Sequence, residues 1–165
     1  MVWLIVIISV AFLIGLISYY KGKEKSAIEE GIAINRGQDF FKQIHIFKTK
    51  TASLDVIYQK MEKSAFSERS ISSKFDPQSE KVVFVNNELG GSFVATLKFR
   101  DRKEGLFLYA FQFDHWRTHN GGISYKDMLG GNIVLTSIEK AMVALDSETT
   151  ITREFVKVKS KTTLL

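Results

Sequence analysis

The fold is decided by Phe93–Phe113, which reads FVATLKFRDRKEGLFLYAFQF. Apolar side chains recur at every second position in both halves of this stretch, and a charged tip followed by Gly105 separates the halves. The second half is the more distinctive, because its alternate residues are all aromatic: Phe107, Tyr109, Phe111 and Phe113. A period of two residues places side chains on one face of a strand. The stretch therefore predicts a β-hairpin with an aromatic inner face.

Four further strands are predicted on either side of the hairpin. Their apolar runs cover residues 43–51, 71–75, 82–85 and 151–159, and such runs bounded by turn residues are typical of strands. Asp76-Pro77 follows the second of them and is a turn signal. Asn and Gly pairs stop the third before the hairpin begins.

Two helices are predicted between these strands. Ser53 is suited to cap a short helix that ends by Phe66. Residues 114–126 are predicted to be an irregular loop ending in a capping box, from which a long helix runs to about Asp146. Gly130-Gly131 either lies inside this helix or delays its start. The apolar stripe of the long helix consists of Val134, Leu135, Ile138, Ala141, Met142 and Leu145.

Strands bunched in the middle of the chain with helices around them predict an α+β fold, in which a small antiparallel sheet packs against one short and one long helix. The order of the elements resembles that of a START-like helix-grip domain over about residues 43–146. The resemblance rests on a strand that leads directly into a short helix over 48–58, a central meander and a late long helix. The resemblance implies a curved sheet wrapped around the long helix. This chain departs from that family in having fewer strands and a strand after the long helix. A TATA-box-binding-protein fold and an elaborated ferredoxin-like sandwich share much the same element order.

The N-terminal segment is predicted to be a transmembrane helix over residues 1–20. Val2–Tyr20 is interrupted only by Ser9, Gly15 and Ser18, and at helical rise it spans about 28 Å, close to the hydrocarbon thickness of a bilayer. A cleaved secretory signal is the alternative, but no basic residue precedes the run and no Ala-x-Ala follows it. Residues 21–42 are then a juxtamembrane connector that begins with a short helix, and residues 43–165 form the α+β domain.

Basic residues next to the apolar run predict the orientation. Lys21, Lys23 and Lys25 follow it directly, and no basic residue precedes it. Because positive charge is retained on the cytoplasmic side, the N-terminus is predicted outside and the domain in the cytosol, with these lysines at the membrane surface. The absence of Cys is compatible with a reducing compartment.

The composition excludes several kinds of chemistry. The chain of 165 residues contains no Cys, which excludes disulfides, thiol nucleophiles and Cys-ligated metal. It also contains neither a G-x-S-x-G nucleophile elbow nor a phosphate-binding glycine loop. No catalytic residue, cofactor or enzyme activity is therefore predicted. The excess of 23 Lys and Arg over 18 Asp and Glu is interpreted as solvated strand faces or membrane contact, and nucleic acid binding is disfavoured.

The densest group of reactive side chains lies in the predicted loop at 114–120. It contains His115, Trp116, Arg117 and His119. Two His residues four apart would share one face of a helix, as metal ligands require, but the H-E-x-x-H context is missing and Gly121-Gly122 favours a loop. No metal site is predicted. These residues are interpreted as a polar surface loop whose Trp packs on the domain or against a partner.

Two functions follow from these patterns. The first is a membrane-tethered interaction or scaffold domain that docks a protein partner. The alternative is a START-like module that binds a lipid or another small apolar molecule. If the aromatic strand face and the long helix enclose a pocket, its ligand-binding residues are predicted to be Phe107, Tyr109, Phe111, Phe113 and Met142.

Overall fold

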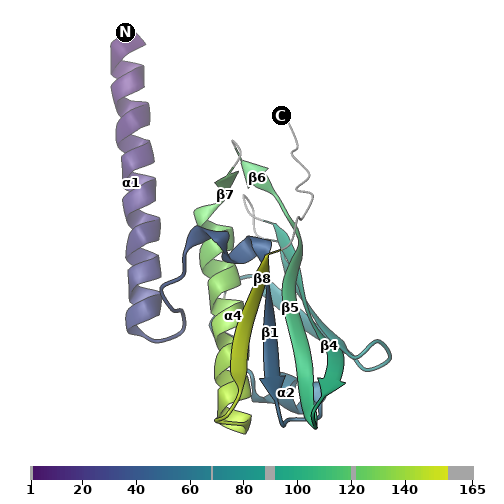
Figure 1. Ribbon diagram of the computed structural model, residues 1–165. Coiled ribbons are helices and arrows are strands. Elements are labelled where there is room, and N and C mark those ends of the chain that lie inside the picture. Colours follow the sequence, from purple (N-terminus) through teal and green to yellow (C-terminus); the bar gives the residue numbers. More distant parts are fainter. Residues whose placement is uncertain (1, 68, 88–91, 120–121, 156–165) are drawn as a thin grey trace.

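The computed structural model describes residues 2–67, 69–87, 92–119 and 122–155, and it confirms an α+β fold (Figure 1). The main element is a six-stranded sheet in the order β2-β3-β4-β5-β1-β8. Its strands are β1 (Gln43–Thr49), β2 (Ile71–Asp76), β3 (Lys81–Asn86), β4 (Phe93–Lys103), β5 (Leu106–Trp116) and β8 (Thr150–Phe155). Every pair of neighbours in this sheet is antiparallel.

The predicted hairpin is the centre of the sheet. β4 and β5 pair from Phe93 opposite Trp116 to Lys103 opposite Leu106. Strand β1, although it comes first in the chain, lies between β5 and β8, with Phe47 opposite both Tyr109 and Ile151. The predicted strands at 43–51, 71–75 and 82–85 are therefore confirmed. The last strand is confirmed to Phe155, and the rest of its predicted range lies outside the described residues.

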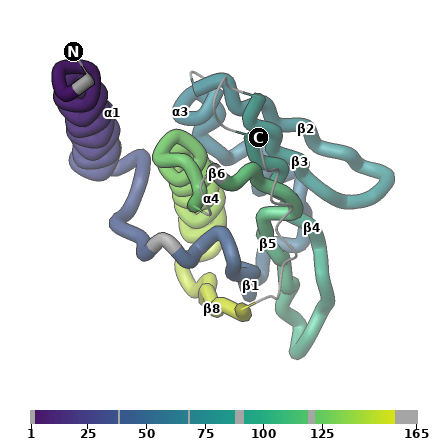
Figure 2. The backbone as a smooth tube through the Cα atoms, turned by 90° about the horizontal axis from the view of Figure 1, so that it is seen from above, coloured from purple at the N-terminus to yellow at the C-terminus, as the bar shows by residue number. Residues whose placement is uncertain are grey.

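One side of the curved sheet is filled by α4 (Tyr125–Leu145), around which the strands bend in the view of Figure 2. Ser124 caps this helix as predicted, because its side chain accepts a hydrogen bond from the Asp127 N–H. Gly130 and Gly131 lie within the helix rather than before it. A Cβ at Gly131 would lie 2.7 Å from Cζ of Phe41. Glycine therefore lets α4 approach the rings of the core closely.

Two parts of the chain differ from the sequence prediction. The short helix is split into α2 (Leu54–Lys60) and α3 (Ser64–Ser67), because Met61 after α2 has extended backbone. The predicted irregular loop at 114–126 is wrong in its first part, since β5 continues to Trp116 and a small hairpin follows, formed by β6 (Thr118–His119) and β7 (Gly122–Ile123). A bulge shifts the β5 register between Phe113 and His115 and turns Trp116 toward the core, where it is 4% exposed.

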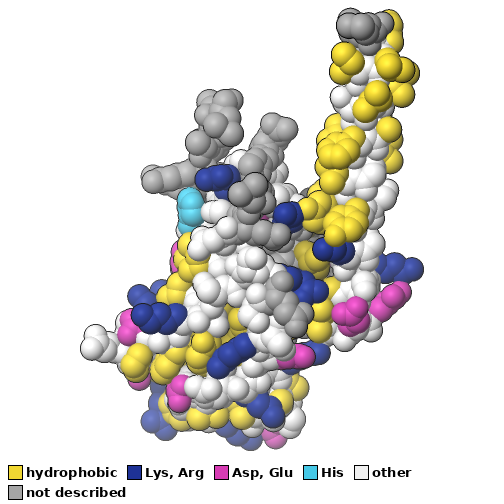
Figure 3. Space-filling model, turned by 180° about the vertical axis from the view of Figure 1, so that it is seen from behind, with side chains coloured by type: hydrophobic (Ala, Val, Ile, Leu, Met, Phe, Trp, Pro, Cys, Tyr) yellow, Lys and Arg dark blue, Asp and Glu magenta, His cyan; other side chains and the backbone are white. Residues whose placement is uncertain are grey.

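The N-terminal helix α1 (Val2–Glu29) runs through the whole apolar segment and into the predicted connector. Apolar side chains cover the part of α1 that stands clear of the domain (Figure 3). The helix ends near Gly31, whose φ of +72° is the left-handed conformation that glycine adopts readily at a helix end. A single turn of 3-10 helix, η1 (Gln38–Lys42), then leads into β1.

The connector is attached to α4 by Arg36, whose side chain is only 4% exposed. Its guanidinium makes a bidentate ion pair with Glu139, at 3.0 and 2.5 Å, and its Nε donates to Asn132 Oδ1 at 2.8 Å. Asn132 in turn donates to the carbonyl of Ile34 at 2.7 Å. Bidentate pairing of this kind fixes orientation as well as distance. The connector is therefore held to the helix that forms the core.

Candidate functional site

The aromatic face of β5 is divided between the core and a pocket. Phe111 and Phe113 are at most 2% exposed, and Met142 of α4 is fully buried beside them in the same hydrophobic cluster. Phe113 stacks on Phe41 of η1 with ring centroids 3.8 Å apart. These three predicted ligand-binding residues are therefore part of the packed core. Phe107, which is partly buried, and Tyr109, which is 1% exposed and belongs to the same cluster, line a pocket of about 380 Å³.

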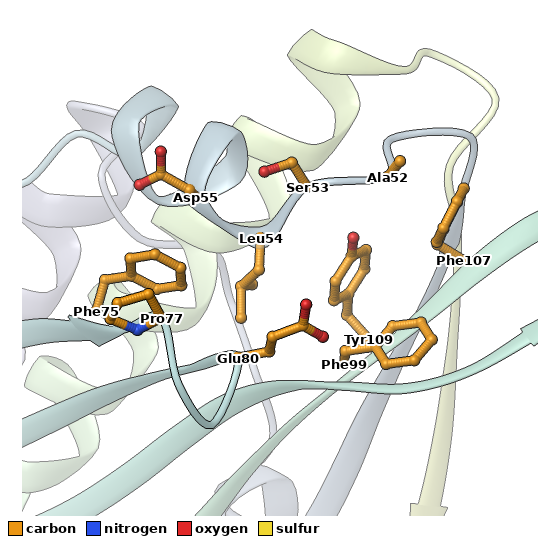
Figure 4. Close-up of a pocket in the computed structure, with 10 residues that line it drawn as sticks. All are labelled: Ala52, Ser53, Leu54, Asp55, Phe75, Pro77, Glu80, Phe99, Phe107 and Tyr109. Carbon is orange, nitrogen blue, oxygen red and sulfur yellow. The ribbon is translucent and has the colours of Figure 1, made fainter.

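This pocket lies at the end of the sheet where β4 joins β5, beside the start of α2 (Figure 4). Its walls are the residues Ala52, Ser53, Leu54, Asp55, Phe75, Pro77, Glu80, Phe99, Phe107 and Tyr109. In Figure 1 this end of the domain is opposite to the N-terminus of α1. The pocket therefore lies at the end of the domain that is far from the N-terminus of α1.

The turn between β2 and β3 positions the acidic side chain of the pocket. Asp76 closes this turn by accepting hydrogen bonds from the Ser79 hydroxyl and the Gln78 N–H, and chiefly the first of these bonds lowers the pKa of its carboxyl. Glu80 then adopts a φ of +43°, which is uncommon for a residue with a side chain. Its carbonyl accepts a hydrogen bond from Phe99 N–H at 3.4 Å, which ties the turn to β4.

The Glu80 carboxylate points into the space between Leu54 and the rings of Tyr109 and Phe99 (Figure 4). No hydrogen bond or ion pair joins this carboxylate to another of the described side chains. Asp55 is directed away from the same rings (Figure 4) and lies 3.3 Å from the Gln59 Nε2 that donates to it. Glu80 is thus the acidic group that the pocket offers to a ligand.

Tyr109 forms the inner wall. Its side chain is 1% exposed, and its hydroxyl donates to the carbonyl of Thr51 at 3.0 Å. Burial, and to a smaller extent the negative charge of Glu80, raises the pKa of Tyr109 to about 12. The phenol is therefore neutral at physiological pH and serves as a ring and a hydrogen-bond donor, not as a base.

The rings of this wall have the arrangement that aromatic clusters prefer. Phe99 meets Tyr109 edge to face at 6.0 Å, and Phe75 stacks on Tyr58 at 6.1 Å. The face of an aromatic ring carries partial negative charge and attracts cations within about 6 Å. Rings on three strands around one carboxylate are chemically suited to a cationic group with an apolar surface.

The residues of the predicted surface loop lie at the opposite end of the domain. Trp116 packs edge to face on Phe41 with ring centroids 6.0 Å apart, so it contributes to the core. His115 and Arg117 are exposed. His119 lies in β6, and its side chain is outside the described part of the structure. Within the described residues, no cluster of three or more His, Asp or Glu could hold a metal ion.

The pattern of the sequence did not reveal two features of the structure, the buried imidazole of His45 and the Glu80 carboxylate of the pocket. His45 on β1 is fully buried, and burial lowers its pKa to about 4. Its Nε2 lies 3.4 Å from the carbonyl of Phe40, while Nδ1 has no partner among the described residues. Glu80 was also missed, because only the turn at 76–81 brings it to the rings. A carboxylate next to a turn is too common in sequences to serve as a signal.

No protein-family model, no curated protein and no solved structure matches this chain.

Proposed function

We propose that this protein is a single-pass membrane protein whose α+β domain binds a partner and carries out no catalysis of its own. The observation that supports this most is the difference in exposed apolar surface between α1 and the domain. Large apolar side chains along α1 are exposed, with Trp3 80% and Phe12 67% accessible, although the core of the domain is already filled. A soluble protein rarely exposes so large an apolar surface, and a bilayer would cover it.

Burial inside the domain accounts for the apolar character of the second long helix, α4. Both α1 and α4 are long and apolar enough to cross a bilayer, but α4 is mostly buried inside the domain. An N-terminal apolar helix is also compatible with a signal sequence. The absence of an Ala-x-Ala cleavage site at the end of the apolar run favours an anchor that is retained.

Lys21, Lys23 and Lys25 at the end of the apolar run support an N-terminus outside and a domain in the cytosol. A reporter fused after Leu165 is then active in the cytosol, and protease added to intact cells leaves the domain whole. Digestion of residues 43–155 from the outside would contradict this orientation. Release of the domain into the soluble fraction after cleavage near Tyr20 would contradict the anchor itself.

The pocket around Glu80, Phe99 and Tyr109, which we call the distal pocket, is the surface that we assign to the partner. Glu80 and Asp55 are its charged lining residues, and none of the cationic side chains in the described part of the chain lines it. Charge complementarity and the aromatic walls favour a cationic group, such as a basic side chain of a partner protein. The position of the pocket, away from α1, leaves it accessible to a partner in solution when α1 is in the bilayer.

A free small molecule is the second candidate, because a pocket of about 380 Å³ is within the usual range for small ligands. The two candidates share one recognition chemistry, which can be tested with tetramethylammonium as a cation and tert-butanol as a neutral molecule of similar shape. We expect tetramethylammonium to raise the melting temperature of the full chain in detergent, relative to sodium at equal ionic strength, and tert-butanol to have no such effect.

The variants for this experiment are Glu80→Gln and a matched control, Glu104→Gln. Glu104 lies at the same end of the sheet, also has a positive φ (53°), and pairs with Lys48 on the surface without lining the pocket. Glu80→Gln is expected to abolish the response to the cation, and Glu104→Gln to retain it. An equal response in both variants would exclude the pocket as the binding site. A lysine-rich peptide that competes with tetramethylammonium would favour the protein partner.

A further inference from the structure

We infer that the groove between α1 and the domain binds the phosphate of an anionic phospholipid. The groove has a volume of about 260 Å³ and is lined on one side by Tyr19, Tyr20 and Lys23 of α1. Its other wall consists of Arg69, Asn86, Lys126, Leu129 and Gly130 from the domain. This inference rests on the proposed insertion of α1 into a membrane, and it assigns a ligand to a surface other than the distal pocket.

With α1 inserted in a bilayer, the groove would lie at the level of the lipid headgroups. If the apolar run from Val2 crosses the hydrocarbon core, it ends at Tyr19 and Tyr20, and tyrosine rings favour the interface between hydrocarbon and water. Lys23 follows one helical turn later, with its Nζ 4.8 Å from the centre of the Tyr19 ring. Figure 3 shows basic side chains on α1 just beyond its apolar part and on the adjacent face of the domain. They gather at the level where phosphates would lie.

The groove also has the charge that an anion requires. Three of its lining side chains are cationic, and none of the carboxylates that the structure describes lines it. The carboxylate of Asp127, next in sequence to Lys126, is fully buried and accepts hydrogen bonds from Asn86 and Ser124. Donors of the domain therefore already occupy this carboxylate, which does not itself line the groove.

Arg69 is already oriented for this role. Its side chain is half-buried, and one Nη donates to the carbonyl of Ala65 at 2.6 Å. A guanidinium has five N–H donors in a fixed plane, so one such bond sets its direction and leaves donors for a phosphate. Neither Arg69 nor Lys23 forms an ion pair with any carboxylate that the structure describes. Basic pockets beside a transmembrane helix on the cytoplasmic side are suited to anionic headgroups.

The alternative is a diffuse attraction between the lysines of α1 and the membrane, and the chain offers a matched control for it. Lys21 and Lys25 flank Lys23 in sequence but do not line the groove. The double variants Lys23→Gln/Arg69→Gln and Lys21→Gln/Lys25→Gln therefore remove the same charge from inside and outside the site. A diffuse attraction would weaken equally in both, whereas a built site is lost only in the first.

The experiment is native mass spectrometry of the full chain in nonionic detergent with added phosphatidylglycerol or phosphatidylcholine. We expect the unmodified chain and the Lys21/Lys25 variant to retain one phosphatidylglycerol molecule in preference to phosphatidylcholine. Retention is expected to be roughly 30-fold weaker in the Lys23/Arg69 variant, from about 1 kcal/mol per basic contact. Lys23→Gln alone leaves every contact of the domain intact, and it is expected to give a partial loss even if the double variant unfolds.

Equal loss in the two double variants would overturn the site, and so would unchanged retention in Lys23→Gln. Displacement of the lipid by inorganic phosphate would also overturn it, because the ligand would then be the free anion. These results are distinct from a failure of the proposed function. Extraction of the chain from membranes by alkaline carbonate would contradict the anchor, whereas the lipid-binding measurement in detergent reports on the groove itself.

Discussion

Replacing Gly131 with alanine sets helix propensity against packing in the centre of α4. On propensity alone, alanine stabilises a helix interior by about 1 kcal/mol relative to glycine. A Cβ at this position, however, would lie 2.7 Å from Cζ of Phe41 and 2.9 Å from Cζ of Phe113, well inside the ordinary carbon–carbon separation of about 3.5–4.0 Å. The two rings are stacked with centroids 3.8 Å apart, and rotation of a phenyl ring about its own axis does not move Cζ, so the clash requires a shift of the whole ring.

Overpacking of a close-packed core costs about 1–3 kcal/mol. Subtracting the gain in propensity, we expect Gly131→Ala to destabilise the domain by about 1 kcal/mol. Gly130→Ala is the matched control, because its new Cβ would meet Cδ1 of Ile71 at 2.9 Å, and this methyl is the end of a flexible side chain. Its clash is therefore relieved by a rotamer change, and we expect Gly130→Ala to be close to neutral.

The assay is urea unfolding of the full chain in nonionic detergent, followed by fluorescence. Trp3→Phe in every variant leaves Trp116 as the only tryptophan, and Trp116 is buried against Phe41 next to the substituted position. A lower midpoint at unchanged slope is the expected result for Gly131→Ala. Stabilisation by about 1 kcal/mol would refute the close-packing argument, because propensity would then be the only effect.

Three further predictions test the core and the histidines. Phe111→Ala is expected to cost about 3–5 kcal/mol in the same urea assay, and near-normal stability together with loss of a co-purifying small molecule would replace the filled core with a pocket. The pKa of His45 falls from 6.5 to about 4 on folding, so between these pH values the unfolded chain binds a proton that the folded chain does not. Stability should therefore fall by up to about 3 kcal/mol as the pH decreases from 6.5 toward 4, and His45→Phe should flatten this slope; an unchanged slope would assign it to other groups. His115→Gln with His119→Gln should alter neither metal content nor melting temperature, and loss of a bound transition metal would show that these residues form a metal site.

Local patterns were sufficient to predict the six strands of the main sheet and the long helix. The two-residue period of Phe93–Phe113 and the capping signal at Ser124 are properties of neighbouring residues, and both features are present in the structure. The placement of β1 between β5 and β8 depends on pairing between distant segments, so it carries no local signal. Trp116 was assigned to a loop because the bulge after Phe113 reverses which positions face the core, and a bulge has no fixed sequence pattern.

The candidate site was predicted only in part, for a related reason. Alternation identifies the residues of β5 that share one face, but it does not identify what covers each of them. Rings from η1, which the sequence did not predict, join α4 over the Phe113 end of the strand. Phe107 and Tyr109, nearer the hairpin tip, meet the start of α2 and the turn at Glu80 instead. One aromatic series therefore contributes to two environments, a core and a pocket.

The contacts of the connector decide how these two environments are placed relative to α1. A connector without contacts to the domain would let the domain rotate freely relative to α1. Here Ala27 and Ala33 are 1% exposed, and Arg36 is held to Glu139 through two hydrogen bonds. Removing one partner from such a buried pair is costly, because the other charge is left unpaired. The contacts therefore keep the basic groove on the side of α1 and the distal pocket on the opposite side, so that a bound headgroup and a bound partner would not compete for the same surface.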